Sequence, residues 1–253
     1  METRRLTVEL GLSGSVVRVE MDVPMGDVPM ERLLPALQTT ADALVSFSAR
    51  NSVAEGKPIS CAAGCGACCR QLVPIAPAEA RQLAVLVEGL AEPRRSVVRE
   101  RFAEALRRAG EAGLLPALKA RGGPADGAAE EISLAYFQLG IPCPFLEAES
   151  CSIYEDRPIA CREYLVTSPP ANCAAPTRES TEMVHLPTRV CAAVAWEEEG
   201  GEDFSKTTLV PLVLSLLWAA KNPRGRDPRP GPELLRSVYA RFAHDRTRER
   251  KRG

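Results

Sequence analysis

Four cysteines within nine residues constrain this chain more than any other feature of its sequence. They stand in the segment Cys61-Ala-Ala-Gly-Cys65-Gly-Ala-Cys68-Cys69. A second, looser set follows at Cys143, Cys151, Cys161 and Cys173. The chain has 253 residues and is 45% hydrophobic, so it is long enough to bury a core without covalent crosslinks. Clustered thiols in a chain of this size are typical of metal or redox sites rather than of a disulfide scaffold.

The spacing of the first set suits a loop that turns several sulfurs toward one centre, because Gly64 and Gly66 favour a tight turn over a helix. Thiolate ligands select zinc or an iron–sulfur cluster over magnesium or calcium. Adjacent side chains diverge, so we do not expect Cys68 and Cys69 to complete the same tetrahedral site. Eight thiols allow two four-thiolate sites, or one cluster beside a redox-active or second metal site. The ninth, Cys191, lies in an apolar segment and is expected to be an ordinary buried thiol.

Hydrophobic periodicity predicts a mainly α (α+β), loop-rich fold. Alternating apolar residues between Leu6 and Val23 predict an N-terminal β-hairpin. The region 143–173 is rich in proline and is expected to be loop with short helices. Apolar residues at helical spacing, with Pro35 in the first turn of the first helix, predict helices over residues 34–50, 77–90, 95–109, 211–220 and 232–243.

We expect these elements to form a single domain over residues 1–253. Residues 1–50 would supply the hairpin plus a helix, and a polar segment over residues 51–60 leads into the cysteines. Residues 58–175 would form the cysteine-cluster metal-binding core. Residues 205–253 would supply the C-terminal helices and a basic tail.

The net charge of −1 hides a basic C-terminus, because eleven Lys or Arg face four Asp or Glu from Lys221 onward. Most of this excess lies between Arg241 and Arg252, which is expected to be a solvated terminus and is the segment suited to dock an unknown protein partner. Few aromatic residues accompany it, which argues against nucleic acid as the partner. The acidic run Glu197–Glu199, with Glu202 and Asp203, is expected to be a solvated loop.

The N-terminal residues lack the apolar stretch of a secretory signal. The longest apolar run, residues 209–220, is shorter than the roughly 20 residues of a membrane-spanning helix. We therefore expect a cytoplasmic protein that does not cross a membrane.

Two arginines, Arg157 and Arg162, lie among the second set of cysteines and are candidate cofactor-binding residues. A guanidinium group beside a cluster offsets thiolate charge and donates hydrogen bonds to sulfur. Arg157 precedes Pro158, however, and can equally anchor a turn.

The cysteine motifs together resemble a known family. The pattern C-x3-C-x2-C-C is followed by Val-Pro-Ile and a Pro-Ala-Glu helix start, then by Cys-Pro-Phe-Leu, then by C-x-I-Y-x-x-R-P-x-x-C-R. Over about residues 58–175 the chain is similar to the YkgJ-type cysteine-cluster family, described as a zinc- or iron-chelating domain. The resemblance implies metal binding by the clustered cysteines and implies little about a reaction. A related branch with a similar cysteine pattern includes flagellin lysine methylases thought to use an iron–sulfur cluster.

The sequence leaves several functions open. The leading hypothesis is a zinc or iron–sulfur protein of redox or metal-handling type. An alternative is a structural-zinc module that docks a protein partner. A third, implied by the resemblance, is an iron–sulfur-dependent methylase-like enzyme. A separate enzyme hypothesis is a radical-SAM protein, because Cys61, Cys65 and Cys68 have the spacing of that motif and Gly200-Gly201-Glu202 follows. The middle of the chain lacks the strand–helix alternation that a β/α barrel needs, which argues against the radical-SAM hypothesis.

Overall fold

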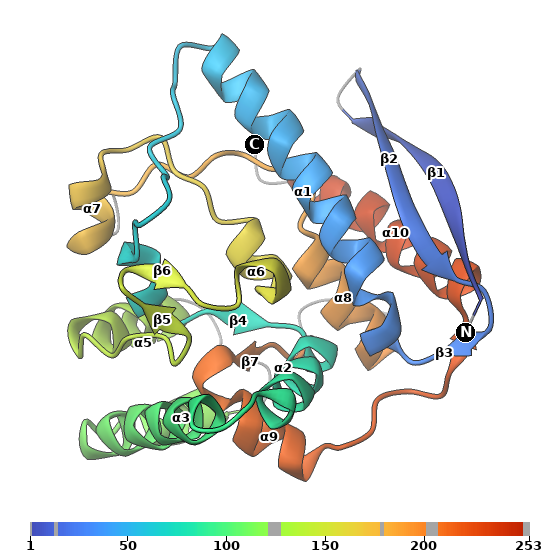
Figure 1. The fold of residues 1–253 in the computed structure, drawn as a ribbon. Coiled ribbons are helices and arrows are strands. Elements are labelled where there is room, and N and C mark those ends of the chain that lie inside the picture. Colours follow the sequence, from blue (N-terminus) through green and yellow to red (C-terminus); the bar gives the residue numbers. More distant parts are fainter. Residues whose placement is uncertain (1, 13–14, 121–127, 178–179, 201–206, 250–253) are drawn as a thin grey trace.

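The described part of the chain is predominantly helical, and its strands form antiparallel pairs (Figure 1). This computed structural model describes residues 2–12, 15–120, 128–177, 180–200 and 207–249, and only the backbone of residues 128–129 and 243–249. The expected mainly α fold with an N-terminal hairpin and C-terminal helices is confirmed. The helices are α1 Met30–Ala54, α2 Pro77–Gly89, α3 Arg94–Glu111, α4 Leu115–Lys119, α5 Ala128–Gln138, α6 Ile159–Arg162, α7 Pro170–Ala174, α8 Val190–Glu199, α9 Ser215–Lys221 and α10 Gly231–Glu249.

The remaining elements are short except for the hairpin. The strands are β1 Thr3–Leu12, β2 Ser15–Pro24, β3 Asp27–Val28, β4 Pro74–Ile75, β5 Leu146–Glu147, β6 Ser150–Cys151, β7 Val210–Pro211 and β8 Arg229–Pro230. They pair as β1–β2, β3–β8, β4–β7 and β5–β6. The 3₁₀ turns among the described residues are η1 Ala67–Arg70, η2 Tyr154–Asp156 and η4 Leu212–Leu214.

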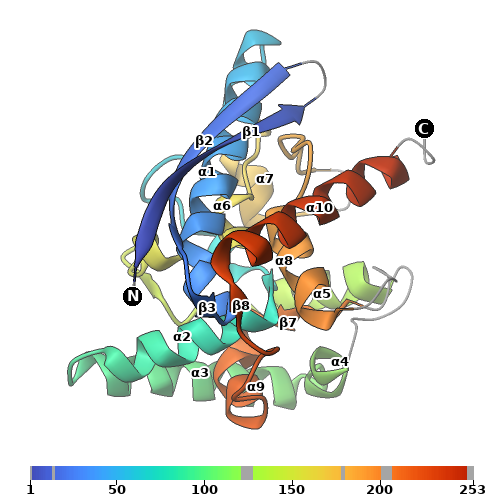
Figure 2. The same cartoon turned by 90° about the vertical axis from the view of Figure 1, so that its right-hand side faces the viewer.

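A first core lies beneath the hairpin, where β2 packs on α1 and α10 (Figures 1 and 2). Val17, Val19, Met21 and Val23 point inward from β2 because side chains of a strand alternate between its two faces. Apolar positions of α1, α8 and α10 complete this core.

Helix α1 is longer than its pattern indicates. It begins at Met30, so Pro35 lies inside the helix and not in its first turn as predicted. Leu33 and Leu34 are almost fully buried, which holds the extra turn in place. At the other end the helix continues through Ala54, into the segment expected to be irregular, and the Ser52 hydroxyl caps the following turn by donating to the Lys57 carbonyl at 2.8 Å.

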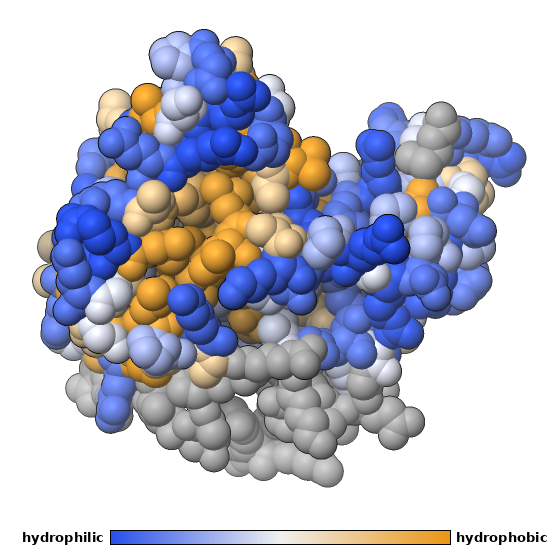
Figure 3. Space-filling view, turned by 90° about the horizontal axis from the view of Figure 1, so that it is seen from below, coloured by the Kyte–Doolittle hydropathy of each residue, from blue (hydrophilic) through white to orange (hydrophobic). Residues whose placement is uncertain are grey.

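A second core lies between α2, α3, α5 and the β7–α9 segment. Both α2 and α3 match their predicted ranges within two residues. Phe102 and Phe145 meet edge to face at 5.5 Å between ring centroids. Figure 3 shows apolar residues gathered on the face at the bottom of Figure 1, where α3 and α9 run. Half-buried Leu106, Leu216 and Leu217 border the second core on these helices. Among the described helices, none is long and apolar enough to cross a membrane.

Helix α2 connects the two cores and brings the cysteine region against them. Its first turn, with Ala78, faces the first core, whereas Ala80, Leu83 and Val87 face the second. The loop that carries the first cysteines runs directly into this helix through β4. The cysteine region is therefore held at the junction of the two cores.

Helix α8 is not predicted by the sequence, and it overturns the expectation that residues 197–199 form a solvated loop. Glu197 is buried, and its carboxylate accepts hydrogen bonds from Arg229 at 2.7 Å and Arg241 at 3.1 Å. Burial acts to raise the pKa of Glu197, but a hydrogen bond with Ser237 together with these two bonds outweighs it and lowers the pKa. Glu198 is buried on the other side of the helix. Glu202 and Asp203 lie outside the described residues.

The basic tail also begins differently from expectation. Arg241, predicted to be solvated, has a side chain only 23% exposed. Its guanidinium stacks 4.5 Å from the centroid of the Trp196 ring while it pairs with Glu197. The backbone of α10 stays helical to Glu249, and residues 250–253 lie outside the described part of the chain.

An ion network around Arg81 ties four helices together. The Arg81 guanidinium pairs with Glu31 of α1 and Glu198 of α8, and it lies 5.7 Å from the centroid of the Trp218 ring in α9. The second oxygen of Glu198 accepts the Ala78 amide in the first turn of α2 at 2.5 Å. Side-chain exposure is 8% for Arg81 and 6% for Glu198, so this pair lies in the interior.

This network makes stability depend on pH. Burial raises the pKa of Glu198 to about 7, although Arg81 opposes the shift. Because the folded state holds this proton more tightly than the unfolded state, Glu198 stabilises the fold at low pH. That contribution is fully present below about pH 4.5 and is lost as the pH rises through about 7. We expect a loss of about 3 kcal/mol across this range from this group. Urea unfolding of Glu198→Gln at several pH values should show a shallower pH dependence than wild type, and equal slopes would contradict this assignment.

Candidate metal centre

Two distant segments of the chain build the cysteine region. The first runs from the end of α1 through η1 to β4, and the second runs from the end of α5 to α7. The Cys143 amide donates to the Cys69 carbonyl at 2.7 Å. At the other end, the Ser60 amide donates to the Val166 carbonyl at 2.9 Å and its hydroxyl to the Thr167 carbonyl at 3.0 Å. These bonds place both sets of predicted cysteines in one region.

An outer group consists of Cys61, Cys65 and Cys173. Gly64 adopts a left-handed φ of 81°, which turns the loop between the first two cysteines, and α7 brings Cys173 against η1. Burial raises the pKa of Cys173, and the neighbouring charges of Cys61 and Cys65 raise it further. Cys61 and Cys65 are exposed, whereas Cys173 is buried. The three thiols are therefore near enough to influence one another, and two of them face solvent.

An inner group consists of Cys143, Cys151 and Cys161. Cys151 stands on β6, and Cys161 stands on the short helix α6. Burial raises the pKa of Cys143 to about 12, and the charge of Cys151 adds to the shift. The pKa of Cys161 is also raised, by burial first and then by Cys143. All three border the second core and are half-buried, so each is less exposed than Cys61 and Cys65, although Cys173 of the outer group is itself buried.

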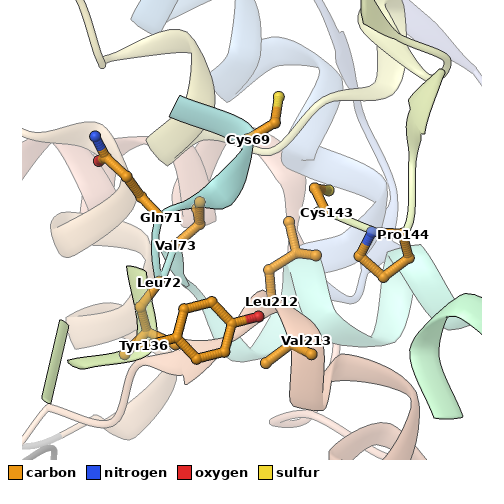
Figure 4. A pocket seen from close by; sticks show the side chains of 9 residues that line it. All are labelled: Cys69, Gln71, Leu72, Val73, Tyr136, Cys143, Pro144, Leu212 and Val213. Carbon is orange, nitrogen blue, oxygen red and sulfur yellow. The ribbon is translucent and has the colours of Figure 1, made fainter. Parts of the chain in front are cut away.

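Cys68 and Cys69 lie between these groups. The pKa of Cys68 is raised, first by a hydrogen bond with Cys69 and then by burial. The Cys68 charge in turn raises the pKa of cysteines in both groups. Cys69 and Cys143 line a small pocket, with Leu212 beside Cys143 and with Tyr136 and Val213 at the far end from Cys69 (Figure 4). The vicinal pair is thus the point where the two groups meet.

The two candidate cofactor-binding arginines have different surroundings. The Arg157 guanidinium lies 4.0 Å from the centroid of the Tyr154 ring. Its positive charge lowers the pKa of Cys68 and of Cys151, against the larger effects that raise them. Arg162 is buried, and its guanidinium donates hydrogen bonds to acceptors within the protein. These are the Asp42 carboxylate at 2.7 Å, the Arg157 carbonyl at 3.0 Å and the Glu155 carbonyl. Arg157 therefore acts on the thiols through its charge while it stacks on Tyr154, and Arg162 shapes the loop that carries them.

Two buried carboxylates that the sequence analysis missed position the helix of Cys161. The Glu79 carboxylate accepts a hydrogen bond from the Ile159 amide at 2.6 Å. It also accepts a hydrogen bond from the Ala76 amide at 2.9 Å, which caps the start of α2. Glu163 accepts the Val190 amide at 2.5 Å, and burial raises the pKa of Glu163 to about 8. Together they fasten α6 between α2 and α8. A Pro-Ala-Glu helix start is a partial signal for Glu79, because Glu at the third helical position is typical of a capping box.

Cys191 lies beside this pair and outside both groups. It is buried, as predicted, and its thiol donates to Glu79 at 3.6 Å. All nine cysteines belong to the described residues, and all have free thiols. Disulfides therefore take no part in holding the region together.

The chemistry of the donor set fits a soft metal, whereas the side-chain arrangement is not yet that of a closed site. The eight free thiols of the two sets stand on two segments that contact each other, and thiolates prefer zinc or iron–sulfur clusters. In the described part of the chain, no three Cys, His, Asp or Glu side chains are grouped so that they could hold a metal ion. Metal ligation would therefore require some of these thiols to change rotamer and lose their protons.

Gly66 is required by the close approach of the β5–β6 hairpin to the cysteine loop. A Cβ at this position would lie 2.5 Å from Glu149 Oε2, 2.9 Å from Leu146 Cδ1 and 3.2 Å from the Glu149 Cα. Arg70 strengthens the same contact, donating to the Gly66 carbonyl at 2.9 Å and pairing with Glu149 at 2.7 Å. The hairpin that carries Cys151 thus rests directly on the loop that carries Cys65 and Cys68.

We expect Gly66→Ala to lower the free energy of unfolding by about 1–3 kcal/mol and to weaken metal binding, because the added methyl group pushes the hairpin away. Gly89→Ala is the matched control, since a Cβ there meets nothing within 4 Å and the change should stay within about 1 kcal/mol. Urea unfolding and metal content measure the two effects. Equal behaviour of the two variants would contradict the close packing of hairpin and loop.

Comparison with known proteins gives one match. A family model with the description "CxxCxxCC: Putative zinc- or iron-chelating domain" matches residues 60–192, which is more than half of the chain. The matched segment contains all nine cysteines and extends beyond the expected core to include Cys191. No curated protein and no solved structure matches the chain.

Proposed function

Since the chain belongs to the CxxCxxCC family of zinc- or iron-chelating domains, we propose that it binds metal in two adjacent thiol groups and handles metal through the outer one. The outer group would use Cys61, Cys65 and Cys173, and the inner group Cys143, Cys151 and Cys161. Cys68 and Cys69 would each complete one of them. Bound zinc or an iron–sulfur cluster would supply a centre that holds the thiolates together and, with iron, can accept an electron.

The exposure of two of the three outer thiols is the observation that carries the proposal. Cys61 and Cys65 are exposed, whereas Cys143, Cys151 and Cys161 are half-buried against the second core. A metal held by exposed thiols can pass to a competing ligand without unfolding the chain. A metal held by the inner thiols can leave only if the β5–β6 hairpin or α6 moves.

The surrounding chain also holds the inner group of cysteines more firmly in place than the outer group. Glu79, Glu163 and Arg162 fix both ends of α6, and Arg157 places a positive charge beside Cys68 and Cys151. This charge would offset part of the negative charge that several thiolates bring to one metal. The inner metal would therefore act as part of the fold, and the outer metal would exchange.

Competition with a chelator tests this division. The full-length chain, purified anaerobically, is expected to release metal in a fast and a slow phase. Cys65→Ser should remove the fast phase and keep the slow one, and Cys161→Ser should remove the slow phase. Metal and acid-labile sulfide analysis of the same samples distinguishes zinc from iron–sulfur. A single phase in wild type, unaffected by Cys65→Ser, would contradict exchange at the outer group.

The alternative is a structural metal module whose basic tail docks a protein partner. It predicts that all metal leaves slowly, together with unfolding of the chain. The fast phase therefore separates the two functions in a single experiment.

A further inference from the structure

The first strand of the hairpin has a long edge with no partner in the described part of the chain. Strand β1 spans ten residues and pairs only with β2 among the described strands. Figures 1 and 2 show β1 along the outside of the hairpin, with β2 between it and α1. Arg5, Thr7 and Glu9 are exposed, whereas Leu6 and Val8 are half-buried.

The ladder register shows which backbone groups this edge presents. The Met25 amide donates to the Glu2 carbonyl at 3.0 Å, one step beyond the Thr3–Pro24 pair. Hydrogen-bonded pairs alternate along an antiparallel ladder, so the even-numbered residues of β1 bond to β2. The amides and carbonyls of Thr3, Arg5, Thr7 and Glu9 therefore point away from β2, toward the open edge.

Two residues of opposite charge lie on this edge, one on each side of Thr7. Arg5 and Glu9 lie two residues to either side of it, and each also faces an opposite charge within the hairpin. Arg5 pairs with Asp22 at 3.0 Å, and Glu9 stands opposite Arg18. Charged residues on an edge strand normally discourage pairing with another chain. Here their order favours one partner strand, an antiparallel copy of β1 itself.

We propose that the chain forms a two-fold symmetric dimer in which β1 pairs antiparallel with β1 of a second copy, with Thr7 opposite Thr7. In this register Arg5 stands opposite Glu9 of the second copy, and Glu9 opposite its Arg5. Across the four-stranded sheet, one row of side chains then consists of Asp22 and Arg5 of one copy followed by Glu9 and Arg18 of the second copy. Neighbouring charges in this row have opposite signs. Opposite charges directly across a strand pair stabilise the pairing.

The inner face of the same sheet is also complementary. Leu6 would stand opposite Val8 of the second copy, and Val8 opposite its Leu6. These side chains are only half-buried in the single chain and border the first core. Pairing would cover their exposed sides and continue the apolar face of the hairpin into its neighbour.

Other registers are disfavoured by the same residues. A shift that centres the pair on Arg5 places two arginines opposite each other, and a shift that centres it on Glu9 places two glutamates together. Like charges directly opposite destabilise a strand pair. A register slip by one residue would also turn the half-buried leucine and valine side chains to the wrong face.

A charge-swap experiment on the full-length chain tests the dimer. Wild type should sediment as a dimer that dissociates on dilution. Arg5→Glu and Glu9→Arg should each raise the dimer dissociation constant by about tenfold or more, because two attractive pairs become repulsive. An equimolar mixture of the two variants should restore the dimer, since each strand then presents the charge that the other lacks. Arg224→Glu, an exposed loop position, is the control for net charge.

A second variant guards against effects on folding. Thr7→Pro removes the amide at the two-fold axis, and proline is tolerated on an edge where that amide faces solvent. It should keep wild-type circular dichroism and metal content while losing the dimer. A wild type that stays monomeric at every concentration would overturn the proposal. So would a dimer that survives Arg5→Glu and Thr7→Pro, or a variant mixture that stays monomeric.

Discussion

Replacing Cys68 by serine is expected to remove at least half of the bound metal and to loosen what remains. Its charge influences cysteines of both groups, and its thiol bonds to Cys69. Serine keeps the size of the side chain but supplies no thiolate at neutral pH. Changes to residues that merely orient a metal ligand already cost about 10- to 100-fold in affinity. Loss of a ligand at the junction should exceed this range.

Cys191→Ser is the matched control for this experiment. It makes the same substitution at a buried thiol that lies outside both groups and donates to Glu79, which a serine hydroxyl can also do. Metal content by elemental analysis and the rate of release to a chelator should stay at wild-type values. A Cys68→Ser chain with the same metal content and release rate as Cys191→Ser would show that the vicinal pair takes no part in ligation.

Arg81→Ala is expected to cause the largest loss of stability, about 3–5 kcal/mol, because it leaves Glu198 and Glu31 in the interior without their cation. Exposure of these carboxylate side chains is only 6% and 18%. The substitution also removes the contact with the Trp218 ring. Chemical denaturation of the metal-loaded chain measures the difference.

Arg107→Ala provides the surface comparison. Arg107 pairs with Glu104 and Glu111 on α3, but its side chain is 56% exposed, so its loss should cost far less stability than the loss of Arg81. The double variant Arg81→Met with Glu198→Gln should recover part of the Arg81→Ala loss, because it leaves fewer unpaired charges. Similar losses for Arg81→Ala and Arg107→Ala would contradict a buried network.

Elements with a clear period could be predicted from the sequence. The hairpin, α2 and α3 each have one apolar face that the chain must bury, and their ranges agree with the pattern. Helix α8 could not be predicted in this way. Its first residues, Val190 to Trp196, are apolar or small on every side because the helix is surrounded by the fold, so no amphipathic period marks it.

The acidic run was misjudged for a related physical reason. Glu197 and Glu198 are adjacent in sequence but point to different sides of α8, where Arg229 and Arg241 meet one and Arg81 meets the other. The cations come from α2 and from the C-terminal segment, far away in sequence. A run of acidic residues stays in solvent only if no cation from a distant part of the sequence pairs with it. The local sequence does not show whether such a cation is present.

The two cysteine sets could be identified from the sequence, but not how they divide. Cys173 joins Cys61 and Cys65 from the first set, whereas Cys68 is close to members of both groups. This division depends on the contact of α7 with η1 and on the bond from Cys143 to Cys69. Which thiols are ligands stays a prediction that metal analysis can test.

X-ray absorption at the edge of the bound metal tests the central claim most directly. The account predicts, for the anaerobically purified full-length chain, a first shell made of sulfur, at about 2.3 Å if the metal is zinc. It also predicts that this shell is lost when the eight cysteines other than Cys191 are changed to serine. A first shell of nitrogen and oxygen, or a sulfur shell that survives those substitutions, would contradict it.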